Sequence, residues 1–395
     1  MAYEQQEIVA RLAEALTNSG CQQQELGAAA GLDKTQISRL LKGERNVSAA
    51  ELGAMADFLG VSATELLTGR APVRRGSRPL ALAARLAEAK RSDELTEQVE
   101  RFRSLLEVKA QVERDVVAPA RPARPNFDLP TTTYRKVQGA QAAHRLREAL
   151  SLGDEPIEDV SGLIEAYFHA DVAREPMPAS VVGLLLQDQE SEDDDPVAVM
   201  LVNSYYPYGK QRFTAAHELA HLLFGDVAEY HEDAAYGERS LVELRADAFA
   251  AELLTPTSGV KVVAKEIGDA PDTPPAHRQW AARLVGTVAS RFGVSVETAR
   301  YRCADLGLVS DVDEATLAAT SAADVLRAAA SDERALALEE ERDVIDPPAL
   351  LTSQALYAYS EGLVGIGTLA QLWRTDDADG LRKELAEAGW VPAFE

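Results

Sequence analysis

Residues 217 to 221 read His-Glu-Leu-Ala-His, in a chain that has six histidines among its 395 residues. Residues four apart share one face of an α-helix, so His217 and His221 can direct two imidazoles toward one metal ion. Glu218 follows the first imidazole, where its carboxylate can reach a water molecule at that metal. The spacing predicts a zinc-binding helix. The alternative is two surface histidines on an ordinary amphipathic helix.

A second helix-prone stretch offers the carboxylates that such a site needs. Glu243 and Asp247 are again four residues apart, and Pro256 follows the end of this stretch. Glu243 is the candidate third ligand, and Asp247 is the candidate partner for the second ring nitrogen of a ligating histidine. Three protein ligands leave a fourth position open for water or substrate, as catalytic zinc requires. Taken alone, an acidic pair at this spacing is more typical of a solvated helix face.

The composition favours a cytoplasmic protein of several domains. The chain is long enough for roughly two to four domains, and 64 acidic residues against 40 basic ones give it a formal charge of −24. This charge argues against non-specific coating of nucleic acid, but it leaves room for a small module with a local basic face. Cys21 and Cys303 form no disulfide framework. The N-terminus is polar, and no apolar run is long enough to span a bilayer, so we expect no membrane association.

Residues 1–70 have the pattern of a five-helix DNA-binding domain. A short helical pattern ends at Gly31 and the next one begins near Lys34, which is the helix-turn-helix order, while Ser48 and Glu51 predict a capping box. The second helix would enter the major groove of double-stranded DNA. The candidate DNA-contacting residues are Lys34, Thr35, Gln36, Ser38, Arg39, Lys42 and Arg45. Because the segment holds six basic and nine acidic residues, the alternative is a small helical domain that binds protein.

Residues 71–126 are predicted to be a linker that contains one long helix. From about Leu80 to Val117 the sequence is rich in helix formers, and its irregular apolar stripe predicts a long helix or a short coiled coil that could form a homodimer. Prolines between Pro119 and Pro130 mark the boundary that follows.

Residues 127–260 are predicted to form the metal-binding domain. Two strand candidates, 180–186 and 197–203, flank an acidic run at 188–195 that we expect to be a solvated hairpin loop. The helix that carries the two histidines should end near Gly225.

Two helical regions complete the chain. Residues 261–340 contain a second helix-turn-helix-like unit, which could be a winged-helix remnant, a dimer contact or a substrate-docking surface. Residues 341–395 are predicted to be a C-terminal tail of two or three short helices. The expected fold class is therefore mostly α with a small β-sheet, an α+β protein.

Two segments resemble known families. The landmarks Gln24-Glu25-Leu26, Ile37-Ser38-Arg39-Leu40 and Lys42-Gly43 resemble the lambda-repressor/Cro-like (XRE) helix-turn-helix family. Residues 212–224 and 243–256 look like the two signature segments of the ImmA/IrrE metallopeptidases, and this resemblance extends over about 135–310.

The second resemblance implies a bacterial regulatory protease with a gluzincin-like zinc site. Such proteases commonly cleave a helix-turn-helix repressor, which relieves repression in stress responses or mobile-element induction. By motif position it implies His217, His221 and Glu243 as metal ligands and Glu218 as the base, while Asp247 stands where the family often has Asn. The fused XRE domain departs from the layout of many relatives, which use a separate repressor, so the repressor cleaved here is expected in trans or in cis.

The expected mechanism is zinc-dependent hydrolysis of a peptide bond. Glu218 would accept a proton from water and deliver it to the leaving amine, and Mn²⁺ is an alternative to Zn²⁺ at a mixed nitrogen and oxygen site. By proximity in sequence, the candidate oxyanion donors are Tyr230, His231 and Tyr236. Two other functions fit the same motifs: a transcription regulator whose peptidase-like domain is a sensor without turnover, and a toxin–antitoxin or phage-defence component that acts by binding a partner.

Overall fold

The central element of the larger part of this protein is a four-stranded sheet with helices on both faces. The computed structural model describes residues 5–19, 23–59, 66, 81–86, 93–116, 122–188, 197–226, 239–329 and 342–392. The chain divides into two compact units, Met1–Pro79 and Leu80–Glu395. Most of the described residues are helical, so the predicted class, mostly α with a small β-sheet, is confirmed.

The first unit has the predicted helix-turn-helix order. Its helices are α1 (Gln5–Ser19), α2 (Gln23–Ala29), α3 (Lys34–Leu41) and α4 (Ala49–Leu59). They enclose a core that includes Leu12, Leu26, Ile37, Leu40 and Met55, all fully buried. The predicted capping box before α4 is confirmed, because Ser48 and Glu51 exchange side-chain to backbone hydrogen bonds. Of the segment after α4, where the fifth helix of the predicted domain would lie, the structure describes Leu66 alone before Ala81.

The sheet of the second unit mixes parallel and antiparallel strands. Its strands are β1 (Ala81–Leu86), β2 (Ala170–Glu175), β3 (Val181–Asp188) and β4 (Val197–Asn203). Their order is β1-β3-β4-β2, with β3 antiparallel to both neighbours and β2 parallel to β4. The predicted pairing of β3 with β4 is confirmed, and β2 was not anticipated. The acidic run between β3 and β4 lies, after Asp188, outside the described residues.

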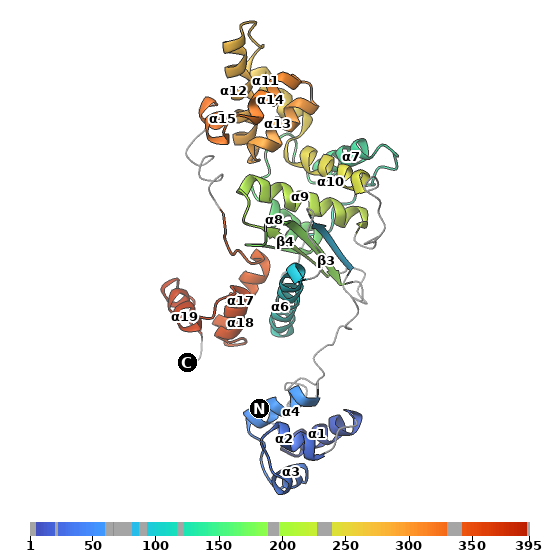
Figure 1. Ribbon diagram of the computed structural model, residues 1–395, viewed down its shortest axis with the longest axis vertical. Coiled ribbons are helices and arrows are strands. Elements are labelled where there is room, and N and C mark those ends of the chain that lie inside the picture. Colours follow the sequence, from blue (N-terminus) through green and yellow to red (C-terminus); the bar gives the residue numbers. More distant parts are fainter. Residues whose placement is uncertain are drawn as a thin grey trace. The chain divides into compact units, whose positions relative to one another are not determined.

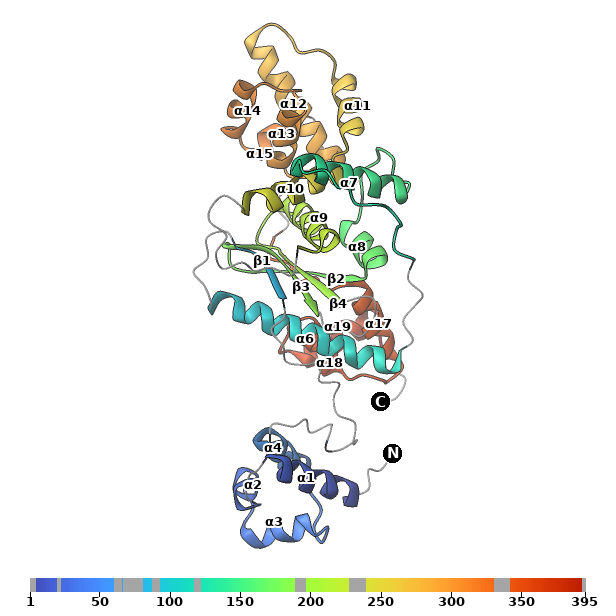
Figure 2. The same ribbon diagram turned by 90° about the vertical axis from the view of Figure 1, so that its right-hand side faces the viewer.

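Strand periodicity sends alternate side chains of the sheet into two separate cores. Met200 and Val202 of β4 face the core built with α7 (Arg135–Ala149), α8 (Val160–Phe168), α9 (Tyr208–Phe224) and α10 (Arg239–Leu254). Val199 and Leu201 face the other core, built with α6 (Asp93–Asp115), α17 (Ala349–Ser360), α18 (Ile366–Leu372) and α19 (Ala378–Glu387). Figure 2 shows α9 and α6 on opposite faces of the sheet.

The prediction of one helix from about Leu80 to Val117 was wrong in its first part. Residues 81–86 form β1, because hydrogen bonding to the edge of β3 outweighs the helix propensity of the Ala- and Leu-rich sequence. Helix α6 begins at Asp93, and its apolar side chains Phe102, Leu105 and Val108 are buried in the core of their own unit. This stripe is therefore not available for the predicted coiled-coil homodimer.

The segment after α10 is a cluster of five helices, drawn in yellow and orange in Figure 1. They are α11 (Thr257–Ile267), α12 (Pro274–Phe292), α13 (Val296–Asp305), α14 (Asp311–Ala318) and α15 (Ala322–Ala328). The predicted second helix-turn-helix-like unit corresponds to α12 and α13, which are joined through Gly293 at a φ of 61°. Among the described helices, none combines the length and the apolarity that crossing a membrane demands.

Candidate metal centre

Helix α9 carries the His-Glu-Leu-Ala-His motif on buried faces. Ala216, Leu219 and Ala220 pack into the core, and His217 and Glu218 are 0% and 1% exposed. The helix ends where predicted, at Gly225, whose φ of 69° is the left-handed conformation that glycine adopts at helix C-termini. Two imidazoles one turn apart are thus held in a site from which solvent is largely excluded.

Helix α10 reaches the same site because it packs unusually closely on α7. A side chain at Gly139 of α7 would collide with the carbonyl oxygen of Arg245, so glycine permits this close approach of the two backbones. Arg245 and its neighbours are fixed in turn, since Nη1 of Arg245 donates to Oε1 of Gln138 at 3.3 Å. The contact directs Glu243 of α10 toward α9.

Three side chains converge on one point between α9 and α10. The Nε2 atoms of His217 and His221 are 2.9 Å apart, and the Glu243 carboxylate oxygens lie 3.4 Å and 3.7 Å from them. One ligand atom from each of the three lies within 4.8 Å of the other two. Ligands about 2.0–2.1 Å from a tetrahedral zinc ion are about 3.4 Å apart. The two distances to Glu243 fit this spacing, and the two histidine nitrogens, at 2.9 Å, lie closer together than a bound ion of this kind would hold them.

The contacts of the two Nδ1 atoms give an independent argument for a cation. Nδ1 of His217 lies 2.9 Å from Oδ1 of Asp247, and Nδ1 of His221 lies 3.2 Å from Oδ2 of Asp226. A neutral imidazole that donates from Nδ1 presents a lone pair at Nε2. Both lone pairs then face each other and the Glu243 carboxylate. Such an arrangement is repulsive unless a positive charge lies between them, so the donor set fits a divalent cation.

Asp226 is fixed by a cation on its other side. Arg245 donates to Oδ1 of this carboxylate. Burial alone would raise the pKa of Asp226, but the hydrogen bonds from His221 and Arg245 and the positive charge of Arg245 hold that pKa below its usual value. An ionised Asp226 keeps the proton of His221 on Nδ1, which leaves Nε2 as the nitrogen that can bind a metal.

Glu218 lies beside strand β3, at a position where the strand has no side chain. Its Oε1 atom is 3.2 Å from the point that a Cβ on Gly183 would occupy, and the same Cβ would collide with Thr214. Glycine at position 183 therefore allows α9 to approach β3 and places the carboxylate of Glu218 next to a strand backbone.

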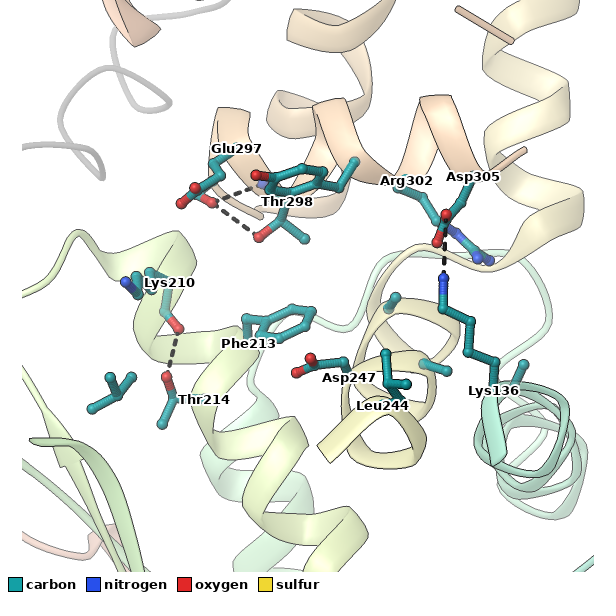
Figure 3. Close-up of a pocket in the computed structure, with 16 residues that line it drawn as sticks. Lys136, Lys210, Phe213, Thr214, Leu244, Asp247, Glu297, Thr298, Arg302 and Asp305 are labelled. Atoms are coloured by element: carbon teal, nitrogen blue, oxygen red, sulfur yellow. Dashed lines mark hydrogen bonds and ion pairs between the residues drawn. The ribbon is translucent and has the colours of Figure 1, made fainter. Parts of the chain in front are cut away.

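A cavity of about 820 Å³ adjoins the site on the side of Asp247. Figure 3 shows Phe213 of α9, Asp247 and Leu244 of α10 and Thr298 of α13 around it. Two of its charged side chains are paired with each other, since Nζ of Lys136 is 3.5 Å from Oδ1 of Asp305. Its volume is within the range of known ligand sites.

The predicted DNA-contacting residues belong to α3 and the turn after it. Lys34, Thr35, Gln36, Arg39 and Lys42 are exposed, and Ser38 and Arg45 are half-buried. Three of these side chains are engaged within the unit, and the longest of their contacts is the ion pair of Arg39 with Glu44 at 3.9 Å. Oε1 of Gln36 accepts from the backbone N–H of Asp33, and Arg45 forms two hydrogen bonds with Glu51. The Arg45 hydrogen bond, followed by one from Ser48, lowers the pKa of Glu51 to about 2.

The three predicted oxyanion donors, Tyr230, His231 and Tyr236, fall in residues 227–238, which lie outside the described residues. The sequence did not predict the roles of Asp226 and Gly183. The signal for Asp226 was its place immediately after the helix-ending Gly225, one turn beyond His221. Gly183 gave no signal, because its importance depends on how α9 packs on β3.

Two family models match the chain. Residues 166–304 match a peptidase family model, the IrrE N-terminal-like domain, and this range includes β2 to β4, α9, α10 and α13. The chain contains an IrrE N-terminal-like domain. Residues 12–66 match a helix-turn-helix model, so α1 to α4 are a helix-turn-helix domain of the XRE type. No curated protein matches the chain in sequence. The IrrE N-terminal-like domain thus contains all three side chains that converge between α9 and α10.

Proposed function

We propose that this protein is a metal-dependent endopeptidase, fused to a DNA-binding domain, that cleaves a helix-turn-helix repressor to control stress-response or mobile-element genes. The observation that carries this proposal is the convergence of His217, His221 and Glu243 beside the buried carboxylate of Glu218. The match of residues 166–304 to a peptidase family supports it.

The metal ligands in this proposal are His217, His221 and Glu243, and the metal is Zn²⁺, with Mn²⁺ as the alternative. When bound, such an ion acidifies a water molecule and polarises the carbonyl group of the scissile bond. Asp247 and Asp226 orient the two imidazoles through Nδ1. Glu218 accepts the proton of the attacking water and returns it to the leaving amine.

The helix-turn-helix domain supplies the regulatory half of the proposal. Helix α3 buries Ile37 and Leu40 and leaves Lys34, Thr35 and Arg39 exposed, which suits a helix that enters the major groove. The chain carries a formal charge of −24, so binding would depend on this local face and weaken steeply as salt rises.

Replacing Glu218 tests the peptidase proposal. We expect Glu218→Gln to keep its bound metal and to lose at least about 100-fold in cleavage rate, the usual contribution of a positioned general base. The matched control is Glu361→Gln, which alters an exposed carboxylate at the end of α17. Metal content is measured by mass spectrometry, and cleavage is followed with fluorescein-labelled casein as the probe.

The same measurements bear on the alternative of a regulator whose peptidase-like domain acts as a sensor. Equal casein cleavage by wild type and Glu218→Gln would remove Glu218 from the mechanism. A wild-type protein that binds metal and a defined operator but cleaves nothing would overturn the peptidase proposal and favour the sensor.

A further inference from the structure

Strand β1 comes from the segment that joins the helix-turn-helix unit to the IrrE N-terminal-like domain. It precedes the family match by about eighty residues, and the second compact unit begins at Leu80, directly before it. Its pairing partner, β3, is otherwise the edge of the sheet. An edge strand presents a row of unsatisfied backbone groups to which an extended peptide can add as a new strand. In this chain, the added strand is the chain's own residues 81–86.

The pairing brings β1 to the candidate catalytic carboxylate. Arg85 pairs with Gly183, the residue beside Oε1 of Glu218, and Leu86 pairs with Val181. Directly opposite residues of antiparallel strands are about 4.5–5.5 Å apart. The backbone of β1 near Arg85 therefore passes close to the part of β3 against which Glu218 lies.

The register of the pair is irregular at this point. Because Arg85 pairs with Gly183 and Leu86 with Val181, Val182 has no opposite residue on β1. Val182 also lines the cavity that adjoins the metal centre. Bulges of this kind redirect side chains and end regular pairing, and they are frequent next to active sites. The irregularity, the cavity and Glu218 thus meet at one place on β3.

We propose that residues 81–86 are a substrate strand for the protein's own metal centre, so that the chain hydrolyses itself there and releases its DNA-binding unit. This inference rests on the proposed peptidase function and commits it to cleavage in cis. Water adds across one amide bond of the segment: the hydroxyl goes to the carbonyl carbon and a proton goes to the nitrogen. Glu218 carries that proton from the water to the amine, and the products are a new carboxylate and a new amino terminus.

The first test measures the pairing without any turnover. In metal-free full-length protein, Ala81→Cys with Gln187→Cys places two thiols opposite each other, and mild oxidation is expected to join them. The matched control pairs Ala81→Cys with Asp188→Cys, because neighbouring residues of a strand alternate between its two faces and position 188 is not the one opposite Ala81. Peptide mapping by mass spectrometry identifies the cross-link. Equal cross-linking of both pairs, or of neither, overturns the proposal.

The second test measures the cut. After Zn²⁺ is added to the wild-type chain, intact mass should show two fragments whose masses sum to the chain plus one water, with the new ends inside residues 81–86. The rate should not change with protein concentration, because the reaction is intramolecular. Ala83→Pro combined with Ala84→Pro should lower the rate at least about 10-fold, since one of two neighbouring N–H groups on β1 faces β3 and proline removes it. Ala71→Pro, outside β1, is the control.

Labelled casein in the same reaction separates the two proposals. If casein is cut while the chain stays intact, or is cut outside residues 81–86, the self-cleavage inference fails and the peptidase function stands. If the self-cleavage rate rises in proportion to concentration, cleavage in cis is likewise overturned. If neither casein nor the chain is cut, the peptidase function itself fails.

Discussion

The two faces of the central sheet bury polar side chains in opposite ways. On the α6 face, Nζ of Lys109 lies 2.6 Å from Asp171 and Nε of Arg101 lies 2.8 Å from Glu175, so both acids of β2 meet a cation of the same chain. On the α9 face, His217, His221 and Glu243 direct acceptor atoms at a common point. Buried acids occur on both faces, but of the two arrangements described here the second is the one whose converging atoms could hold a metal ion.

Removing a metal ligand on the α9 face should have the largest effect on bound metal and on stability. His217→Ala takes away one of the converging acceptors, so we expect bound metal to fall from about one ion per chain to a small fraction of that. The stabilisation by metal, about 5 kcal/mol when free metal exceeds its Kd ten-thousand-fold, should be lost with it. Metal analysis and thermal unfolding with and without chelator measure both effects.

His144→Ala is the control for that experiment, because His144 is an exposed residue of α7 that pairs loosely with Glu148. A His217→Ala protein that binds metal as tightly as His144→Ala would remove His217 from the ligand set.

Removing the cation of a buried ion pair on the α6 face should have the next largest effect on the free energy of unfolding. Lys109→Met leaves Asp171 buried without its cation, which typically costs about 3–5 kcal/mol in the free energy of unfolding. Adding Asp171→Leu should recover most of that loss, since an apolar pair needs no charge balance. Urea unfolding provides the values, with the exposed Lys383→Met as a control that should change stability by less than about 0.5 kcal/mol.

Equal stability of the Lys109→Met and Lys383→Met variants would show that the chain does not depend on charge balance at this face.

Glu165 offers a third case to compare with the two faces, because this buried acid accepts hydrogen bonds from backbone N–H groups. Burial is the main cause that raises its pKa to about 7, although N–H groups of Leu350 and Val172 act in the opposite direction. Between about pH 4.5 and 7 the folded state keeps this proton while the unfolded state loses it. Its contribution is therefore fully present below pH 4.5 and is lost as pH rises to 7, a decline of about 3 kcal/mol.

Glu165→Gln has no proton to lose at this position, so its unfolding free energy should decline less steeply over that pH range. Urea unfolding at several pH values compares the slopes. Superimposable pH profiles would contradict a raised pKa for Glu165.

The smallest effects should come from the carboxylates that orient the imidazoles. Asp226→Asn weakens the acceptor for His221 and should lower metal affinity about 10–100-fold, or about 1.4–2.7 kcal/mol. Asp247→Asn should cost less, because the Asp247 side chain is 40% exposed and that of Asp226 is 16% exposed. Competition with a chromogenic chelator measures both affinities. The reverse order would mean that burial does not set the strength of these contacts.

The sequence predicted what depends on local spacing. His217, His221 and Glu243 could be chosen because helical periodicity relates two of them and a second helix supplies the third. The α3 surface was predictable for the same reason, since Ile37 and Leu40 identify its buried side. Asp226 and Gly183 were not found, because their roles depend on a chain reversal at Gly225 and on the packing of α9 against β3.

The linker shows the limit of reasoning from composition. Residues 81–86 are Ala-Leu-Ala-Ala-Arg-Leu, which has strong helix propensity, yet they pair with β3. The apolar stripe of α6 is visible in the sequence, which allows a second copy of the chain as its partner, but the stripe packs on the sheet and on helices α17 and α18. Pairing and packing between distant segments are tertiary effects, and the periodicity of the sequence does not predict them.

The link from Arg245 through Asp226 to His221 ties helix α10 to helix α9 by side chains of the protein alone. This geometry forms as the chain folds. The side chain of His221 therefore loses its conformational freedom during folding, before an ion binds. Capture of the ion then requires little ordering, as in any preorganised receptor. A rigid receptor of fixed spacing also selects among ions by their radius and coordination geometry, which charge alone does not distinguish.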